Sequence, residues 1–358
     1  MPERGLYERG GDLVIHIVGT GTIGEPLIGL LCDTREDLGI DEITFYKHTP
    51  ALIDRPMVKG LITRGANLCV HAERVKDFQN LGLEPTYVSE EAIKRANVVV
   101  DCTPKGIGLQ NKERYYDRYR DRVKGFLAQG SEFGFGKMYA VGINDEAVTP
   151  EDQFIHIVSC NTHNIAVVIK TLGVNHVKEG RFVCIRRAND ISENKKFIPA
   201  PEVGEHNGEM GTHQAVDVYH LYKTLGIELN VFSSALKINT QYMHCIWFDV
   251  KLSRKITLEE VIEKFIENPR VAVTNKTSSS LVFSFGRDHG HYGRILDQTI
   301  IILPTLHVIN GNEVVGFCFT PQDGNSLLSS ITMAERFLYP DSYEDKLRCL
   351  ESFLFQEV

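Results

Sequence analysis

A cysteine at a predicted strand-to-helix junction is the side chain best placed for covalent chemistry. Cys160 follows a strand predicted over Phe154–Ser159 and precedes a helix predicted over Asn164–Leu172. The positive end of a helix dipole favours the thiolate at such a junction, and the thiolate is the nucleophilic form of the side chain. Because a cysteine that only packs in the core would fit the same spacing, the position alone leaves both interpretations open.

A glycine-rich turn near the start of the chain could bind phosphate groups. An apolar strand over Leu13–Val18 leads into Gly19-Thr20-Gly21-Thr22-Ile23-Gly24, and a helical stretch and a strand over Glu42–Tyr46 follow. In this context the glycines permit a tight turn, close approach of a pyrophosphate and close helix–strand packing, and the helix N–H groups face the phosphates. We predict a dinucleotide site that includes Gly19, Gly21 and Gly24; a turn without a ligand is the alternative.

The residues after the second strand bear on the choice of cofactor. NAD sites usually carry a carboxylate there for the ribose hydroxyls, whereas this strand continues into Lys47-His48-Thr49. Lys47 and Thr49 could hold a 2′-phosphate that a carboxylate would repel. The sequence therefore favours NADP, with NAD as the alternative cofactor and a solvated strand end as the other interpretation of Lys47.

Two kinds of sheet are predicted to position these groups. Up to about Ser159, short apolar strands alternate with helices, and the strand over Ala96–Asp101 has the valines of a strand buried on both faces. The loop after it contains Thr103 and lies where open α/β sheets bind ligands, so it is a second candidate for cofactor contact. A charged, exposed helix is predicted next, over Gln110–Val123.

Beyond residue 160 the predicted strands become longer and more widely spaced, as in a mixed or antiparallel sheet. They cover Arg181–Arg187, Ser234–Asn239, Met243–Leu252 and Gln298–Leu303, with helices over Leu258–Asn268 and Ser326–Phe337 and a long loop over 188–212. The predicted fold class is α/β, with a Rossmann-type dinucleotide-binding domain followed by an α+β catalytic domain that has a mixed or antiparallel sheet.

Length and composition exclude several classes of protein. The chain has 358 residues, 42% of them hydrophobic, and 47 acidic against 39 basic side chains give a net charge of −8. That length predicts about two domains, and the acidic balance argues against nucleic-acid binding. No apolar run reaches the roughly 18 residues that cross a bilayer, and the first residues lack the apolar segment of a signal peptide. We therefore expect a cytoplasmic protein without a membrane partner.

The cysteines and histidines indicate no metal site. The eight cysteines include no CxxC pair, which argues against a zinc ribbon or a thioredoxin-like motif and predicts free thiols. His206, His213 and His220 recur at regular intervals, and His289 and His291 form an HxH pair in a turn predicted to be exposed. Neither group has a carboxylate or cysteine at a recognised ligand spacing, so we predict solvated histidines and no metal.

Several blocks around these residues together resemble a known family, the archaeal-type (class II) glyceraldehyde-3-phosphate dehydrogenases. The resemblance runs from about Val14 to Phe337, and ordered blocks at matching separations are much more specific than any one of them. The blocks are Gly19–Gly24, Val99–Asn111 (VVDCTPKGIGLQN), Gln129–Glu132, Ser159–Thr162, Ile185–Ala188 and Met243-His244. The resemblance implies a nucleotide-binding domain over 1–158, a catalytic domain over 159–320, a C-terminal helical segment over 321–358 that packs back on the first domain, and a homotetramer.

The resemblance also implies the chemistry and the site residues. Cys160 would attack an aldehyde carbonyl and His244 would act as the general base, while hydride transfer to the nicotinamide would leave a thioester on Cys160. The backbone N–H beside Cys160 or the Asn161 amide could stabilise the oxyanion. Further cofactor contacts would be Thr22, Ile23, Gly130, Ser131, Arg186 and Gln322. Substrate contacts would be Ser159, Asn161, Thr162, Arg187, His213 and Gln214.

Departures from the family pattern leave the substrate open. The family has threonine, glycine and arginine where this chain has His163, Asn164 and Val167, and losing an arginine removes a charge-assisted contact to a phosphate. One interpretation is a divergent phosphorylating glyceraldehyde-3-phosphate dehydrogenase. Another is a CoA-dependent semialdehyde dehydrogenase, such as malonyl- or succinyl-CoA reductase, whose dicarboxylic substrate would need a cation from Arg186, Arg187 or His163.

A third hypothesis is a non-catalytic, nucleotide-binding regulatory protein descended from the enzyme. The changes after Cys160 would permit it, but the joint presence of Cys160, Asn161 and His244 argues against it. For an enzyme, the expected partners are a small-molecule aldehyde or activated acyl substrate, together with phosphate or coenzyme A.

Overall fold

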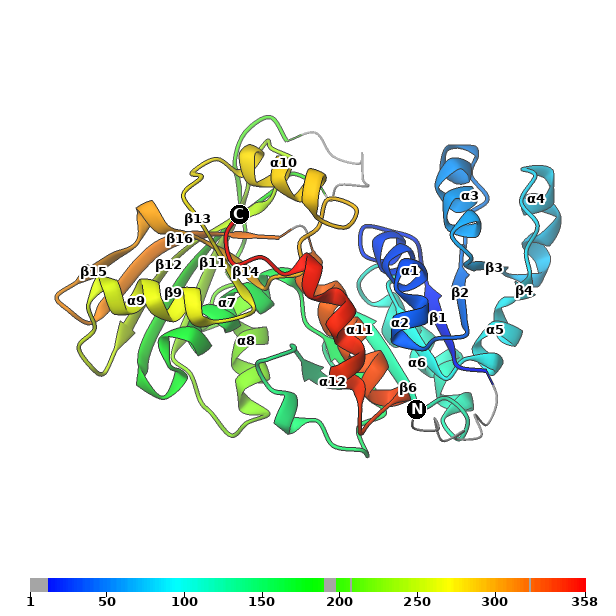
Figure 1. The fold of residues 1–358 in the computed structure, drawn as a ribbon, viewed down its shortest axis with the longest axis horizontal. Coiled ribbons are helices and arrows are strands. Elements are labelled where there is room, and N and C mark those ends of the chain that lie inside the picture. Colours follow the sequence, from blue (N-terminus) through cyan, green and yellow to red (C-terminus); the bar gives the residue numbers. More distant parts are fainter. Residues whose placement is uncertain (1–11, 190–197, 207, 322) are drawn as a thin grey trace, which may run out of the picture.

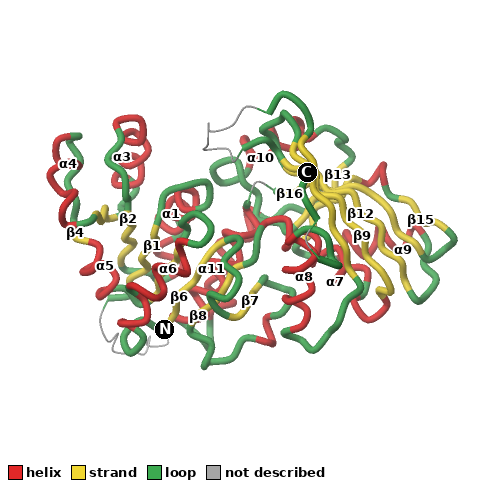
Figure 2. Tube along the Cα trace, turned by 180° about the vertical axis from the view of Figure 1, so that it is seen from behind, coloured by secondary structure: helices red, strands yellow, loops and turns green. Residues whose placement is uncertain are grey.

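The computed structural model describes residues 12–189, 198–206, 208–321 and 323–358. In this part of the chain two eight-stranded sheets lie side by side, and helix α11 (Gly324–Leu338) runs between them in both views (Figure 1, Figure 2). The predicted α/β class, with a Rossmann-type sheet and a second, mixed sheet, is confirmed. None of the helices described there is long and apolar enough to cross a membrane.

The first sheet is parallel, in the order β4-β3-β2-β1-β5-β6-β8-β7. Its strands are β1 (Val14–Val18), β2 (Glu42–Tyr46), β3 (Asn67–Val70), β4 (Tyr87–Val88), β5 (Val98–Asp101), β6 (Gly125–Gln129), β7 (Lys137–Tyr139) and β8 (Phe154–Ile157). Its helices are α1 (Gly24–Asp33), α2 (Arg35–Leu38), α3 (Arg55–Thr63), α4 (Val75–Asn80), α5 (Ser89–Arg95) and α6 (Ile107–Arg114). The strand order reverses between β1 and β5, and ligands bind beyond the carboxyl ends of such strands.

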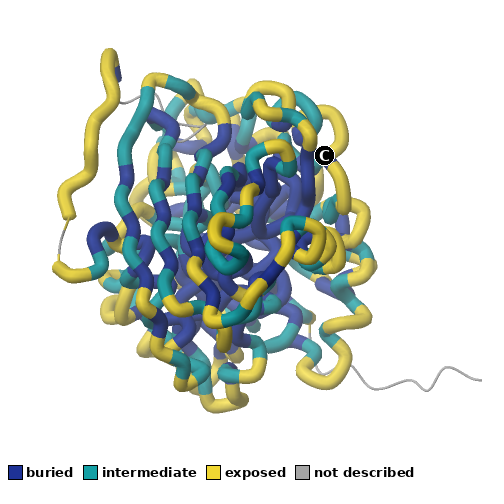
Figure 3. The backbone as a smooth tube through the Cα atoms, turned by 90° about the vertical axis from the view of Figure 1, so that its left-hand side faces the viewer, coloured by how far each residue is buried: buried dark blue, intermediate teal, exposed yellow. Residues whose placement is uncertain are grey.

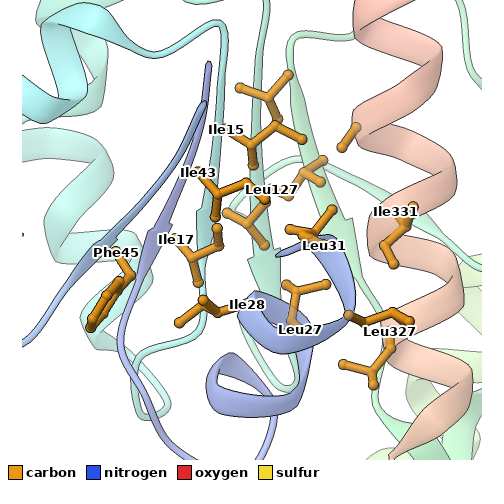
Figure 4. Close-up of a cluster of buried hydrophobic side chains, with 14 of the residues drawn as sticks. Ile15, Ile17, Leu27, Ile28, Leu31, Ile43, Phe45, Leu127, Leu327 and Ile331 are labelled. Atoms are coloured by element: carbon orange, nitrogen blue, oxygen red, sulfur yellow. The ribbon is translucent and has the colours of Figure 1, made fainter. Parts of the chain in front are cut away.

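The core of the first sheet includes side chains from near the end of the chain. Ile15 and Ile17 of β1 pack in one cluster with Leu31 of α1 and with Leu327 and Ile331 of α11 (Figure 4). All five are almost completely buried, and each such burial stabilises the fold by roughly 1.5–3 kcal/mol. The first sheet is therefore completed by a helix that follows the last strand of the second sheet.

The second sheet has the order β10-β11-β9-β12-β16-β14-β13, with β15 also paired to β16. The β9–β11 and β13–β14 pairs are parallel and the others are antiparallel. Its strands are β9 (Val177–Arg186), β10 (Glu202–Val203), β11 (Val231–Lys237), β12 (His244–Leu252), β13 (Val271–Thr274), β14 (Thr299–Ile302), β15 (His307–Ile309) and β16 (Glu313–Thr320). Helices α7 (Cys160–Leu172), α8 (His213–Lys223) and α9 (Leu258–Glu267) share a core with its inner face, and α10 (Ser279–His289) and α12 (Tyr343–Lys346) complete the helices.

The segment after β5 differs from the single exposed helix predicted over Gln110–Val123. Helix α6 ends at Arg114, and a 3-10 turn over Tyr116–Tyr119 follows. Tyr116 is 1% exposed, and its hydroxyl donates a hydrogen bond to Asp101 at 2.6 Å. The prediction was wrong because the charged residues around Tyr116 favour an exposed helix, whereas the Tyr116 side chain packs in the core.

Candidate active site

Cys160 is the first residue of α7, one turn before the predicted start at Asn164. The Ser159 hydroxyl caps this helix by accepting a hydrogen bond from the backbone N–H of Thr162 at 3.4 Å, and it also contacts the Thr162 hydroxyl at 2.8 Å. Cys160 is half-buried beside the positive dipole end of a 13-residue helix. This environment favours the thiolate, so the geometry suits a nucleophile.

Thr320 connects the start of α7 to His244. The Thr320 hydroxyl donates to the amide oxygen of Asn161 at 3.1 Å, and Thr320 lies directly across the β12–β16 pair from His244. Because the amide oxygen of Asn161 accepts this bond, the NH2 group of Asn161 points away from Thr320. In that orientation it can donate to a substrate oxygen. The structure thus brings the residue next to Cys160 and the predicted imidazole to one end of the second sheet.

The ring of His244 is buried and is held by a backbone donor. The N–H of Arg187 donates to Nδ1 of His244 at 3.0 Å. Burial, together with the positive charges of Arg187 and Arg186, lowers the pKa of His244 well below its usual range, although the charge of Asp323 acts in the opposite direction. His244 is therefore a neutral imidazole at physiological pH.

Arg187 and Asp323 form a buried ion pair behind this ring. Nη2 of Arg187 donates to the Asp323 carboxylate at 2.8 Å. Burial alone would raise the pKa of Asp323, but the charge and hydrogen bond of Arg187 lower it to about 2. The guanidinium that was expected to contact substrate is thus bound to a carboxylate of this chain.

A cleft of about 1310 Å³ opens at the carboxyl ends of the first sheet. Nine of the predicted cofactor residues line it: Gly19, Gly21, Thr22, Ile23, Lys47, Thr49, Thr103, Gly130 and Ser131. A Cβ atom at Gly24 would lie 2.1 Å from the carbonyl oxygen of Gly19, whereas a Cβ at Gly21 would meet no atom of the described residues within 4 Å. Gly24 therefore permits the close packing of helix and turn, and Gly21 leaves the backbone open to the cleft. The residues present fit a dinucleotide with its pyrophosphate at the start of α1.

Cys160 follows the same edge of the first sheet as the cleft, because β6 and β8 are neighbours, although it is not among the residues that line the cleft. Gln129 of β6 pairs with Ile157 of β8, and Gly130 and Cys160 follow the carboxyl ends of these two strands. Gly130 and the thiol of Cys160 therefore belong to one edge of the first sheet.

A turn over residues 291–294 holds the glycine turn in place. Arg294, which is 6% exposed, donates from Nη2 to the carbonyl oxygen of Thr22 at 2.8 Å. Tyr292 adopts a left-handed conformation (φ 51°), and its ring lies so close to α1 that a Cβ at Gly29 would be 2.5 Å from it. His291 is only 8% exposed, so the prediction that this HxH turn is solvated was wrong for this histidine. The sequence gives little indication that His291 is buried, because the charged residues and glycines of the turn are typical of a surface loop.

Lys47, the predicted ligand of a 2′-phosphate, is paired within the cleft. Its ammonium group lies 2.7 Å from the carboxylate of Asp54, and both residues line the same cleft as Thr49. Sequence reasoning missed Asp54, because it lies in the segment that leads into α3 and not at the end of β2. The charge available to a phosphate at this position is therefore smaller than that of an unpaired lysine.

The residues that depart from the family pattern face the protein core. His163 is fully buried, with Nδ1 3.0 Å from the carbonyl oxygen of Ser159 and Nε2 2.7 Å from the Ser329 hydroxyl. Burial lowers the pKa of His163 to about 4, so it does not supply the cation that we considered for a dicarboxylic substrate. Val167 is 1% exposed in the core of the second sheet, and Asn164 binds the backbone of Phe319. These replacements therefore lie in the packing of α7 against its neighbours.

Two more of the predicted site residues, His213 and Gln214, begin α8. His213 is exposed at the surface, but desolvation of its ring and the charges of Arg186 and Lys105 lower its pKa, which places three basic groups near one another. Gln214 is buried, and Gln322 lies outside the described residues. Lys105 was not predicted as a site residue, although it belongs to the same loop as Thr103. Among the described residues no group of three or more His, Cys, Asp or Glu side chains could hold a metal ion.

Comparison with known proteins shows a consistent set of relatives. The chain is 31% identical over 263 residues to the glyceraldehyde-3-phosphate dehydrogenase of Metallosphaera sedula, covering 70% of this chain and 72% of the relative. It is 27% identical over 306 residues to the glyceraldehyde-3-phosphate dehydrogenase of Pyrobaculum islandicum (84% and 85% covered). The relative of that name from Methanobacterium formicicum is 29% identical over 309 residues (83% and 86%). No protein-family model matches the chain.

Proposed function

Because the chain belongs to the archaeal-type glyceraldehyde-3-phosphate dehydrogenase family, we propose that it is a phosphorylating glyceraldehyde-3-phosphate dehydrogenase that forms a thioester on Cys160. Membership supports an NAD(P)-dependent oxidoreductase; the substrate and the covalent chemistry are the proposal. The observation that carries it is the hydrogen-bonded connection from Asn161, next to Cys160, through Thr320 to the strand position of His244.

Each of these residues has a distinct task in the proposed reaction. The thiolate of Cys160 adds to the aldehyde carbon, and the amide NH2 of Asn161 donates to the carbonyl oxygen as it becomes negative. His244 is the imidazole that acts on the same oxygen. When bound, the nicotinamide would supply the hydride acceptor. Loss of hydride from the former aldehyde carbon leaves a thioester on Cys160. Inorganic phosphate then attacks the thioester, and the thiolate of Cys160 is released.

The phosphate group of the substrate requires positive charge near the thiol. Lys105 and Arg186 are the basic groups whose charges lower the pKa of His213 at the start of α8. We propose that these two side chains attract the substrate phosphate, because Arg187 is bound to Asp323. A charge-assisted contact of this kind requires no arginine at the buried position of Val167.

Assays of the purified protein distinguish the proposed enzyme from its alternatives. We expect oxidation of glyceraldehyde-3-phosphate that depends on inorganic phosphate, and reduction of 1,3-bisphosphoglycerate in the reverse direction. Reduction of malonyl-CoA or succinyl-CoA without activity on the phosphorylated substrates would identify the CoA-dependent semialdehyde dehydrogenase instead. Turnover of none of these substrates, together with measurable cofactor binding, would support the non-catalytic regulatory protein.

The covalent step has a separate test at the thiol. We expect iodoacetate to label one cysteine rapidly and stoichiometrically, to be slowed by substrate, and to leave Cys160→Ser unlabelled at this rate. Cys318→Ser is the matched control, because Cys318 is fully buried and burial raises the pKa of its thiol. Full dehydrogenase activity in Cys160→Ser would contradict a thioester intermediate.

The proposed cofactor is NADP. Lys47 and Thr49 line the part of the cleft that follows β2, where the ribose of a bound dinucleotide is expected, and a lysine favours a 2′-phosphate. Asp54 reduces this preference by pairing with Lys47. We therefore expect a lower KM for NADP than for NAD, and a lower KM for NAD would reverse the assignment.

The domain organisation is proposed from the positions of the sheets. Residues 1–158 would form the nucleotide-binding domain and residues 159–320 the catalytic domain, because the strands of the first sheet end at Ile157 and those of the second begin at Val177. Residues 321–358 would pack back on the first domain through α11, whose apolar side chains belong to its core.

A homotetramer is proposed from the outer face of the second sheet. Along β9 and β12 buried residues alternate with half-exposed ones, as Figure 3 shows from this side. Adjacent strands bring Val183, Trp247 and Phe317 into one row of the half-exposed face, with Ile185 and Cys245 in the next. An apolar sheet face of this kind favours burial against another subunit. We expect a mass about four times that of the 40.4 kDa chain, and smaller species for Trp247→Lys.

A further inference from the structure

A second cavity lies at the far end of α7, the helix that begins at Cys160. Its volume is about 400 Å³, and it is lined by the end of α7, the 3-10 turn over Val174–His176, the segment after β12 and helix α9. Lys170, in the last turn of α7, is ten residues from Cys160, which corresponds to about 15 Å along the helix. Among the described residues, this cavity and the cofactor cleft have no lining residue in common. The second cavity is therefore separate from the candidate active site.

The cavity is basic, although the chain as a whole has a net charge of −8. Half of its lining residues carry basic side chains: Lys170, His176, Arg254 and Lys264. The other lining residues in the described part of the chain are aliphatic residues, a glycine and an asparagine, so the lining contributes no carboxylate to balance the charge. Cations held close together repel one another, and an anion bound among them would relieve this repulsion.

Hydrogen bonds between distant segments build the walls of the cavity. The N–H of Ser253 donates to the carbonyl oxygen of His176 at 2.7 Å, which brings the 3-10 turn beside the segment that carries Arg254. The side-chain amide of Asn268, the residue after α9, donates to the Thr171 hydroxyl at 2.8 Å near the end of α7. The basic side chains are therefore mounted on segments whose backbones are fixed relative to one another.

The guanidinium of Arg254 contains a buried donor. Its Nε atom is inaccessible to solvent and has no hydrogen-bond partner within the described part of the chain. A buried donor without an acceptor costs free energy, and such groups are rare in folded proteins. Because a guanidinium can donate two parallel hydrogen bonds to one phosphate group, a phosphate would supply the acceptor that this donor requires.

The two lysines differ in their surroundings. Lys170 donates to the carbonyl oxygen of Ile143 at 3.2 Å and lies where a cation suits the negative end of the dipole of α7. Lys264 lies one turn after Glu260 in α9, but the carboxylate of Glu260 accepts from the N–H of Thr257 at 2.8 Å in a capping box. The nearest preceding acid on this face of the helix is thus already engaged, and the charge of Lys264 remains for a ligand.

We propose that this basic cavity binds a small molecule that carries phosphate groups. Arg254 would orient a phosphate through paired hydrogen bonds, and Lys264 and Lys170 would attract it as point charges. The volume of the cavity lies within the range of small-molecule sites, roughly 300–1,000 Å³. An inorganic diphosphate and an organic phosphate ester share the chemistry that these side chains recognise. The proposal goes beyond the proposed function and does not depend on it.

Calorimetric titration with inorganic diphosphate tests this site. The protein is first saturated with its dinucleotide, so that the probe is kept out of the cofactor cleft. We expect the wild type to bind diphosphate, and Arg254→Gln and Lys264→Gln each to bind it at least about tenfold more weakly, because each variant loses a charge-assisted contact. Arg254→Lys should also bind more weakly, since it keeps the charge and loses the paired donors.

Two further variants control for charge and for the active site. Lys255→Gln removes an exposed cation next to Arg254 in sequence; Lys255 donates to the carbonyl oxygen of Asn310 and does not line the cavity, so affinity should not change. Lys105→Gln, in the loop that lines the cofactor cleft, should also leave it unchanged. Absence of binding by the wild type, equal weakening in Lys255→Gln, or loss of binding in Lys105→Gln would overturn the proposal. So would unchanged affinity in both Arg254→Gln and Lys264→Gln.

Hydrogen exchange locates the probe without any substitution. We expect diphosphate to slow amide exchange over residues 173–176 and 253–256, and slowing confined to the glycine turn or to the start of α7 would overturn the proposal. Titrations with inorganic phosphate and with a sugar bisphosphate distinguish the sources of the ligand. Tighter binding of the sugar bisphosphate than of diphosphate would support an organic phosphate, and tighter binding of diphosphate would support an inorganic anion.

Discussion

The guanidinium of Arg294 binds the carbonyl oxygen of Thr22 in the glycine turn at 2.8 Å. Arg294 comes from the segment between α10 and β14, whereas Thr22 lies at the start of the chain. A residue from the part of the chain that forms the second sheet therefore stabilises the glycine turn. The backbone of this turn is where a dinucleotide pyrophosphate would bind. A cofactor site that looks local in sequence thus depends on a residue from the other half of the molecule.

Removing this contact should weaken cofactor binding more than catalysis. A hydrogen bond from a charged group contributes about 1.5–3 kcal/mol, so we expect Arg294→Gln to raise KM for the cofactor by about tenfold while kcat changes less than about twofold. Arg287→Gln is the control, because Arg287 is exposed and pairs with its neighbour Asp288. Steady-state kinetics on both variants provide the comparison. An unchanged KM in Arg294→Gln would mean that the turn keeps its shape without this bond.

The two ends of the glycine turn should respond differently to a methyl group. In Gly21→Ala the new Cβ meets no protein atom within 4 Å, so we expect an unchanged melting temperature and cofactor affinity at least about tenfold weaker. In Gly24→Ala the Cβ would lie 2.1 Å from the backbone of Gly19, so we expect a loss of about 1–3 kcal/mol in stability. Thermal unfolding and calorimetric titration distinguish the two effects. Normal cofactor affinity in a folded Gly21→Ala would place the pyrophosphate elsewhere.

The Lys47–Asp54 pair should tune the choice between NADP and NAD. Lys47→Gln removes the cation proposed for the 2′-phosphate, so we expect KM for NADP to rise about tenfold while KM for NAD stays within about twofold. Asp54→Asn releases Lys47 from its 2.7 Å ion pair, and KM for NADP should fall. Lys59→Gln, at an exposed position of α3, should change neither constant. Equal effects of Lys47→Gln on both cofactors would contradict a role specific to the phosphate.

A buried carboxyl in α11 should make stability depend on pH. Burial raises the pKa of Glu335 to about 8, and within the described part of the chain neither of its carboxyl oxygens has a hydrogen-bond partner. Because its folded-state pKa lies above the unfolded value of 4.5, the folded protein binds the extra proton between these values, and stability falls as the pH rises from about 4.5 to 8. Glu335→Gln should therefore raise the melting temperature at about pH 8 and have little effect at about pH 4.5.

The control for this measurement is Glu351→Gln, at an exposed position near the C-terminus. It should shift the melting temperature by similar, small amounts at both pH values. If the difference between Glu335→Gln and the wild type were the same at both values, the carboxyl of Glu335 would already be ionised in the folded protein throughout this range.

Much of the first sheet could be predicted because its elements follow from local patterns. The strand over Glu42–Tyr46 is found with the predicted bounds, and the glycine turn lies between β1 and α1 as predicted. The second sheet was harder: β16 contains Gly316, and a glycine inside a strand weakens its pattern. The burial of Tyr116 and His291 was missed because it depends on packing against segments that are distant in sequence, and the polar residues next to them in sequence do not indicate those contacts.

The sequence by itself determined the residue types of the site: a glycine turn before a helix, a thiol at a strand end and a histidine at the start of a later strand. Their chemistry depends on a few adjacent residues, so it can be recognised without a structure. Tertiary structure alone decided that His163 is a neutral core residue, that Arg187 presents its N–H to His244, and that Arg294 holds Thr22. Burial, charge and tautomer depend on atoms contributed by distant segments, and only the folded chain brings those atoms together.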